Sequence, residues 1–202
     1  TAVTIAGNDR PRVWDAKSGK LRFELPAMGE EYFVRTLSIE KKGKRALAVY
    51  ADRLSPDRFW DRTGTYAYRL MDLTRPQSNP ALRILERGQR VAGIDLERDR
   101  ILVEGNKAIQ IVDIKSGRVL TEVAVAEEPL QVALAPDSRM FAALIVVDGE
   151  QVVRVWDAQS GILIAGDLRL FPQFPTDWRE QRRIGRGPLD EGPLVFSPDG
   201  TR

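Results

Sequence analysis

Short apolar runs separated by turns rich in Asp, Ser, Pro and Gly extend along most of the chain. The clearest stretch carries four such runs, at 130–134, 141–147, 152–156 and 162–165. Runs of this length that are bounded by turn residues predict β-strands rather than helices. The segments between the runs also favour strands joined by turns. Pro136 and Asp137 suit the centre of a β-turn, and Asp148 with Gly149 suits the turn of a hairpin. The stretch therefore predicts four consecutive antiparallel strands, called a to d in chain order.

Two earlier stretches show the same succession of strands. Residues 91–125 predict strands at 91–96, 101–104, 108–112 and 119–125. Residues 33–85 predict strands at 33–39, 45–50, 65–71 and 81–85. Nearer the N-terminus, 21–25 alternates strictly between apolar and polar residues, as an outer strand with one solvated face does.

A short sequence motif recurs where each strand c ends. RVWDAKSG at 12–19 returns as RVWDAQSG at 154–161, with the looser copies QIVDIKSG at 110–117 and RLMDL at 69–73. The Asp residues of these copies fall at positions 15, 72, 113 and 157, so the spacings are 57, 41 and 44 residues. A period near forty with several short strands in each unit is typical of a propeller blade. We predict an all-β fold, a β-propeller of about four four-stranded antiparallel blades.

The two ends of the chain complement each other. Residues 194–202 read as a strand a with its turn, and 2–6 read as a strand b with no strand a before it. Either the ends share one blade and close a ring, or a longer propeller was divided between equivalent points. Four blades are few for a ring, so we favour a divided propeller or two copies that pair through their unpaired blade edges. The expected propeller segment, 1–202, then holds blades at 194–202 with 1–25 (unless divided), 33–85, 91–125 and 130–165, and an insertion at 166–192.

These residues resemble the WD-repeat propeller family. The marks are the pairs Trp14-Asp15 and Trp156-Asp157 and the Ser-Pro-Asp-Gly turn at 197–200, and the resemblance covers nearly the whole chain. It implies four-stranded antiparallel blades and a role in holding other proteins. The repeats of this chain diverge from the family, because Met71 and Val112 replace the expected Trp and the family's buried His network cannot form without His. We therefore expect blade stability to rest more on apolar packing. Lactonase-type and quinone-cofactor propellers remain alternatives for the fold.

Composition removes several classes of function. The net charge is +2, from 31 Lys and Arg and 29 Asp and Glu residues, so we expect no nucleic-acid partner. Cys and His are both absent, which rules out disulfides, thiolate zinc sites and the commonest general base. No apolar run is long enough to span a membrane. We expect a region of a longer, cytoplasmic protein.

The recurring Asp residues are the first candidates for chemistry. We interpret Asp15, Asp72, Asp113 and Asp157 as turn residues, because an active site needs one constellation and a turn recurs with every blade. Trp14 and Trp156 lie within strands and are expected in the core. Without a phosphate loop or a Ser-His-Asp set, we predict no catalytic residue, no metal site and no cofactor.

Two insertions carry the candidate binding residues. One lies between strands b and c at 52–64, and the other follows strand d at 166–192, where Asp177 and Glu180 predict a capped short helix near 177–184. In a blade the b–c and d–a connections leave from one face, so both insertions should rise from that face. Aromatic and Arg residues dominate interface hot spots. The predicted partner-binding residues are Arg58, Phe59, Trp60, Trp178, Arg179, Arg182 and Arg183.

Other interpretations of these insertions remain. The aromatic residues could simply pin the loops down, and the Arg-rich helix could meet phosphate or form local ion pairs. Our prediction is a non-catalytic scaffold that binds a protein partner, as part of a larger protein. The alternative is a propeller enzyme of the lactonase or quinone-dependent type, which a central carboxylate cluster with a bound metal or cofactor would favour.

Overall fold

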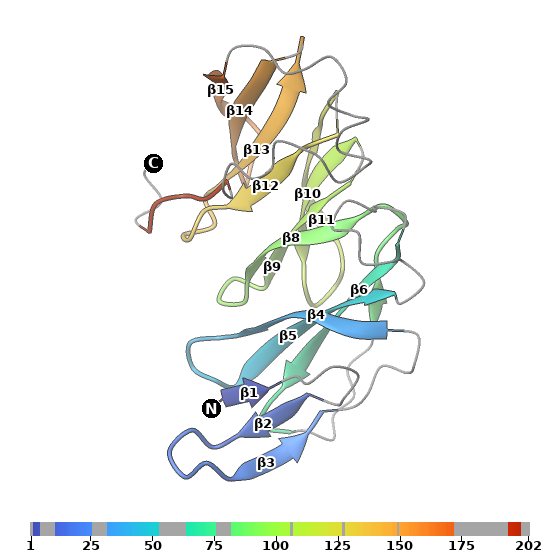
Figure 1. Cartoon of the computed structure of the whole chain (residues 1–202), viewed down its shortest axis with the longest axis vertical. Coiled ribbons are helices and arrows are strands. Elements are labelled where there is room, and N and C mark those ends of the chain that lie inside the picture. The colour runs from blue at the N-terminus through green and yellow to red at the C-terminus, as the bar shows by residue number, and fades with distance from the viewer. Residues whose placement is uncertain are drawn as a thin grey trace. The chain divides into compact units, whose positions relative to one another are not determined.

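The part of the chain that the structure describes consists of strands and turns (Figure 1). This computed structural model describes residues 2–4, 11–25, 32–52, 64–75, 82–105, 107–126, 128–148, 150–171 and 194–198. These ranges contain fifteen β-strands and no helix, so the predicted all-β class is confirmed. Within them no helix could cross a membrane. The helix predicted near 177–184 lies outside the described residues.

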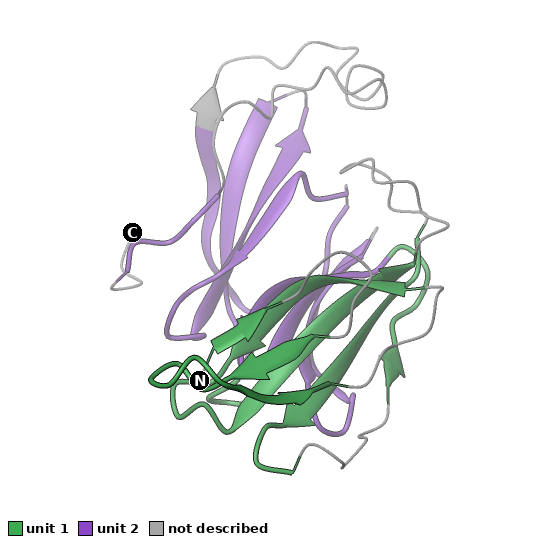
Figure 2. Cartoon of the chain, turned by 60° about the horizontal axis from the view of Figure 1, so that its bottom comes forward, with its two compact units in different colours: residues 1–57, 63–88, 96–98 green, residues 58–62, 89–95, 99–202 purple. Residues whose placement is uncertain are grey.

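Two compact units divide the chain between them (Figure 2). The first unit contains the strands up to residue 88 and the turn at 96–98, and the second contains the remaining strands. Each unit has two antiparallel sheets in which the strands follow one another in chain order. Antiparallel strands that are neighbours both in the chain and in the sheet form the meander that the sequence predicts for a blade.

The first unit begins with a sheet of three described strands, in the order β1-β2-β3. Its strands are β1 (Ala2–Thr4), β2 (Arg12–Trp14) and β3 (Leu21–Glu24). They take the places of strands b, c and d. No fourth strand joins this sheet among the described residues, so β1 is its edge.

The second sheet of the first unit has all four strands, in the order β4-β5-β6-β7. The strands are β4 (Tyr32–Ile39), β5 (Arg45–Asp52), β6 (Tyr66–Asp72) and β7 (Arg83–Ile84). Every residue between Ala46 and Ala51 is buried, so β5 is covered on both faces. One of these faces packs on the first sheet, where Val13 and Leu25 meet Ala46, Ala48, Tyr50, Ala67, Met71 and Leu73.

The second unit repeats this arrangement. Its first sheet contains β8 (Arg90–Asp95), β9 (Arg100–Glu104), β10 (Ala108–Asp113) and β11 (Val119–Ala124), in that order. Its second sheet contains β12 (Gln131–Leu134), β13 (Met140–Val147), β14 (Glu150–Asp157) and β15 (Leu163–Phe171), in that order. Seven of these eight strands lie close to the expected ranges; β15 extends well beyond the predicted end at 165.

An apolar core joins the two sheets of the second unit. Side chains of β9, β10 and β11 meet those of β13 and β14, with Leu102, Ile111 and Val123 on one side and Phe141 and Trp156 on the other. Burying a large apolar side chain contributes roughly 1.5–3 kcal/mol. That blade stability rests more on packing of this kind than on a His network stays a prediction.

The other face of the last sheet carries a second apolar cluster. Leu130, Ala142, Leu144, Val146 and Val153 form it, and Leu194 and Phe196 pack against it. The backbone N–H of Leu194 donates a hydrogen bond to the side-chain oxygen Oε1 of Gln131. Residues 194–198 form no strand, in contrast to the strand predicted at 194–197. No described strand pairs with this segment. Its position is stabilised instead by the packing of Leu194 and Phe196 against the apolar cluster.

Candidate interaction surface

The seven residues predicted to bind a partner lie outside the described residues. These are Arg58, Phe59 and Trp60 of the first insertion and Trp178, Arg179, Arg182 and Arg183 of the second. Their assignment as binding residues therefore stays a prediction. The structure describes the strand ends from which the two insertions leave, and these ends fix the edge of each sheet that carries an insertion.

The first insertion leaves the second sheet at the edge where strand a begins. Tyr32, the first residue of β4, pairs with Asp52, the last residue of β5. The backbone N–H of Asp52 also donates to the carbonyl of Thr65 (3.1 Å), which closes the base of the insertion. In this sheet, as the topology predicts, the b–c connection and the start of strand a share one edge.

The second insertion leaves the last sheet in the corresponding way. Val147 pairs with Glu150 at the turn between β13 and β14, and Gln151 pairs with Phe171 at the end of β15. The b–c turn and the end of strand d therefore share one edge of this sheet. The described strand ends thus place the exit of each insertion at the predicted edge of its own sheet.

At the opposite edge, the recurring Asp residues build the c–d turns. Asp113 Oδ1 accepts hydrogen bonds from the backbone N–H and the hydroxyl of Ser116, both at 2.6 Å. Its carbonyl accepts from the N–H of Gly117 (2.8 Å), whose φ of 73° is in the left-handed region that glycine adopts readily. Asp15 with Ser18 and Asp157 with Ser160 repeat these contacts.

In the copy at 69–73, Thr74 takes the role that Ser has in the other three turns. Asp72 Oδ1 accepts from the backbone N–H (2.8 Å) and the hydroxyl (2.6 Å) of Thr74. In all four turns these hydrogen bonds hold the pKa of the carboxyl group below its usual value, and the Ser or Thr contacts are the main cause. The four carboxylates are therefore ionised turn acceptors, as the sequence predicts.

The two Trp residues of the repeated motif differ in their surroundings. Trp156 is buried and stacks on Phe141, with ring centroids 5.3 Å apart and an interplanar angle of 16°. Trp14 is only half-buried, and its Nε1–H donates to the Thr4 hydroxyl (2.8 Å). The expected core position is thus found for Trp156 but not for Trp14, because no described sheet covers that face of β2.

A polar pair joins strands c and d in three of the sheets. Three residues before the turn Asp stands Arg or Gln, and it contacts an acidic residue nine or ten positions after that Asp. The pairs are Arg12 Nε with Glu24 Oε1 (3.0 Å), Gln110 Nε2 with Glu122 Oε2 (2.6 Å) and Arg154 Nε with Asp167 Oδ1 (2.7 Å). The hydrogen bond from Arg154 is the main cause that lowers the pKa of Asp167. We call these contacts the cross-strand rungs.

The second sheet has the basic half of a rung without its acid. Arg69 stands three residues before Asp72, and the register that pairs Tyr68 with Arg83 places Leu82 opposite Arg69. Arg69 is buried, and its Nε and Nη1 have no hydrogen-bond partner. Arg69 is not among the site residues predicted from the sequence, although its position three residues before the turn Asp was a signal for it.

Two buried carboxylates of the described residues, Glu104 and Glu40, are paired with Arg. Arg90 Nε lies 2.7 Å from Glu104 Oε1, whose side chain is almost wholly buried. Arg45 Nε lies 2.7 Å from Glu40 Oε2, and Arg45 Nη2 donates to the carbonyl of Leu96 (2.7 Å). The described residues contain no group of three acidic side chains placed to hold a metal ion.

Comparison with known proteins gives information on the fold. No protein-family model matches the chain, and no curated protein is similar to it. A chain of the "Crystal Structure of Mitotic Checkpoint Complex" is similar in structure, with a TM-score of 0.52 and 19% identity. The similarity covers 78% of this chain and 44% of that chain. A chain of "Kuenenia stuttgartiensis Hydrazine Synthase" has a TM-score of 0.49 and 15% identity, over 80% of this chain and 43% of that one.

This chain therefore spans less than half the length of each of these two chains. The first similarity and the succession of antiparallel sheets agree with the architecture predicted from the repeats. The chain is a segment of a β-propeller.

Proposed function

We propose that this chain is a WD-repeat-like propeller region that acts as a non-catalytic scaffold for a protein partner within a larger protein. The contact surface is the edge that carries the two insertions. There Phe59, Trp60 and Trp178 supply apolar area, and the neighbouring Arg residues orient the partner and raise the rate of association.

The observation that carries this proposal is the use of the repeated carboxylates. In each c–d turn the Asp side chain accepts two or more hydrogen bonds from its own turn, so the most regular acidic feature of the chain is structural. The features that the blades do not need are the two insertions. An interaction surface uses such additions to a rigid scaffold.

Sheet topology also supports the choice of these edges. The first insertion leaves its sheet at Asp52, on the edge where strand a of that sheet begins. The second insertion leaves its sheet at Phe171, on the edge where strand d ends and the d–a connection starts. Elements on equivalent edges of propeller blades can act together on one partner.

The test is quantitative affinity capture with the full-length protein and two single variants, Trp60→Ala and Trp178→Ala. We expect both variants to lose a common set of proteins that the wild type retains, because hot-spot aromatic residues contribute about 2 kcal/mol or more to binding. Lys17→Ala is the matched control, because Lys17 is exposed on a c–d turn. It should capture the same set as the wild type.

The melting temperature of each variant decides how a loss is interpreted. Loss of the common set with an unchanged melting temperature supports the scaffold. Retention of every partner by both Trp variants excludes this surface. A large fall in melting temperature shows instead that the aromatic side chains pack within their own loops.

A further inference from the structure

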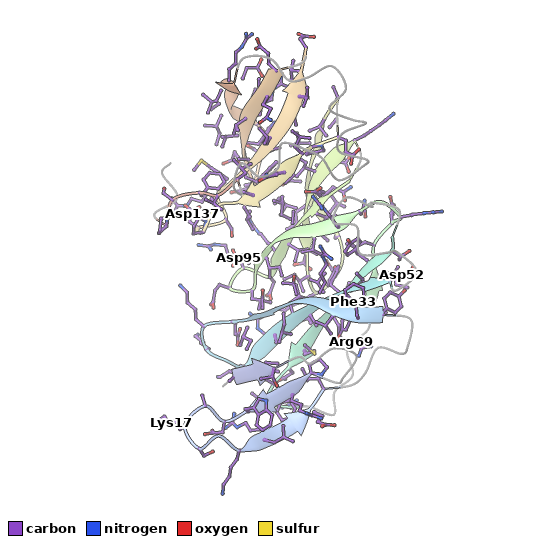
Figure 3. All side chains as sticks on the ribbon, in the orientation of Figure 1. Lys17, Phe33, Asp52, Arg69, Asp95 and Asp137 are labelled. Atoms are coloured by element: carbon purple, nitrogen blue, oxygen red, sulfur yellow. The ribbon has the colours of Figure 1, made fainter. Side chains whose placement is uncertain are left out.

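Arg69 is a buried cation in an apolar environment. It lies on β6 (Figure 3), between Ala67 and Met71. Alternation along the strand places these three side chains on one face. Ala67 and Met71 belong to the core between the two sheets of the first unit. Arg69 is 9% exposed, and Leu82, which takes the place of the acid in this rung, packs against the same core.

Tyr50 is a second unpartnered polar group on this face. In the register of β5 with β6, Tyr50 pairs with Ala67 and Ala48 pairs with Arg69. Tyr50 and Arg69 are therefore diagonal neighbours, a separation that long side chains span. The Tyr50 hydroxyl is buried and has no hydrogen-bond partner. Burial raises the pKa of Tyr50, so the hydroxyl keeps its proton at neutral pH and remains a donor.

These two side chains place only donors at one buried position. Arg69 contributes Nε–H and Nη1–H, and Tyr50 contributes O–H, with no acceptor bound to any of them. A buried guanidinium without a counter-charge is strongly unfavourable, and buried polar groups are normally hydrogen-bonded. In the other three sheets the residue at the same strand position has its own acidic partner, so among the described strands the missing acid is specific to Arg69.

We propose that Arg69 and Tyr50 form a buried receptor for one oxyanion, a carboxylate or a phosphate group. The Nε–H and Nη1–H donors of a guanidinium are spaced to bind two oxygens of such a group side by side. The Tyr50 hydroxyl donates to an oxygen of the same group. The bound anion replaces the carboxylate that the other Arg rungs obtain from strand d. This inference does not depend on the proposed scaffold function.

The test measures anion binding by the intact protein with two probes, inorganic phosphate and acetate, each exchanged against chloride at constant ionic strength. We expect a saturable rise of the wild-type melting temperature with at least one probe, because a ligand that binds only the folded state stabilises it. Equilibrium dialysis with the effective probe then gives the dissociation constant directly. A response to phosphate alone identifies a phosphate site, and a response to acetate identifies a carboxylate site.

Two variants assign the binding to these residues. Arg69→Met removes the charge and retains the apolar stem, and it should weaken binding about tenfold or more, through loss of a charge-assisted hydrogen bond. Tyr50→Phe removes one neutral donor with little change in shape, and it should weaken binding by about fivefold. Arg154→Met is the matched control, because Arg154 has its own partner in Asp167, and it should bind the probe as the wild type does.

Several outcomes overturn the proposal. One is a wild type that responds to neither probe, and another is an Arg69→Met variant that binds as tightly as the wild type. Equal weakening by Arg154→Met would show a general charge effect and exclude the site. If Arg69→Met does not fold, Tyr50→Phe decides the question, and unchanged affinity in that variant excludes the receptor.

Discussion

At the residue scale, one carboxylate organises each c–d turn. The Asp side chain satisfies donors of the turn, and the glycine that follows supplies the left-handed conformation at Gly19, Gly117 and Gly161. This role was predictable from sequence because it depends on residues only a few positions apart. The surroundings of Arg69 and Trp14 were not predictable in the same way, because they depend on which sheet covers a given face.

The contribution of a turn carboxylate can be measured at Asp113. Asp113→Ala removes the acceptor of both Ser116 hydrogen bonds and should lower the free energy of unfolding by about 1–2 kcal/mol. Asp113→Asn retains an acceptor oxygen and should lower it by less. Chemical denaturation of both variants tests this, and equal losses would show that the charge rather than the turn hydrogen bonds is responsible.

The same carboxylates make the protein sensitive to acid. Asp15, Asp72, Asp113 and Asp157 all have a lowered pKa in the folded state. Their stabilisation is therefore complete above the unfolded-state pKa of about 4, and it is lost as the pH falls from there through the folded-state values. Melting temperatures measured from pH 6 to pH 2 should fall mainly below about pH 4. The fall should be shallower in Asp113→Asn, and an identical profile would contradict this origin.

At the scale of elements, the apolar runs predicted the strands well and their ends less well. β15 continues beyond the predicted end at 165 because its pairing with β14 continues through register shifts near Gly166 and Asp167, and Asp167 has a φ of 48°. Such irregular pairing has no simple alternation for a sequence to show. The predicted strand at 194–197 failed for a different reason, since strand structure needs a partner strand and not only an apolar pattern.

A close approach between the first strands of the two sheets in the second unit gives a test at this scale. A Cβ added to Gly93 on β8 would lie 2.7 Å from the Cβ of Leu134 on β12, and that atom cannot move without its backbone. Gly93→Ala should therefore lower the free energy of unfolding by about 1–3 kcal/mol. Gly105→Ala is the control, because its nearest neighbours would lie at 3.4 Å or more. Denaturant titration should show little change for Gly105→Ala, and equal effects of the two variants would refute the steric explanation.

At the scale of the whole molecule, the repeats predicted the propeller architecture, and the candidate site depends on insertions that have no repeat. A repeat shows its structural role by recurring, whereas Trp60 and Trp178 occur once each in their loops and offer no internal comparison. That the two ends of the chain pair, within one chain or between two copies, is still a prediction. Residues 2–4 form an edge strand, and Val195 is an exposed apolar side chain at the other end of the chain.

Pairing of the two ends can be tested by cross-linking, because the chain has no Cys of its own. The double variant Val3→Cys, Val195→Cys should form a disulfide under mild oxidation. Paired antiparallel strands bring opposite Cα atoms to about 4.5–5.5 Å, which lies within the range that a disulfide bridges. A disulfide within the monomer indicates a closed ring, and a covalent dimer indicates two paired copies. The single variant Val3→Cys controls for chance dimers, and a double variant that stays reduced shows that the ends do not pair.

The c–d turn has one more consequence, which concerns the origin of the repeats. In the segment 157–161 the Asp157 oxygens accept hydrogen bonds from Gln159, Ser160 and Gly161, so a handful of adjacent residues complete the turn. A gene segment that encodes such a hairpin encodes every residue that the turn needs for its hydrogen bonds. It can therefore be duplicated without any matching change elsewhere. The rest of a copied blade can then change, as Val112 shows at the place of Trp156, while Asp113, Ser116 and Gly117 keep the hydrogen bonds of the turn.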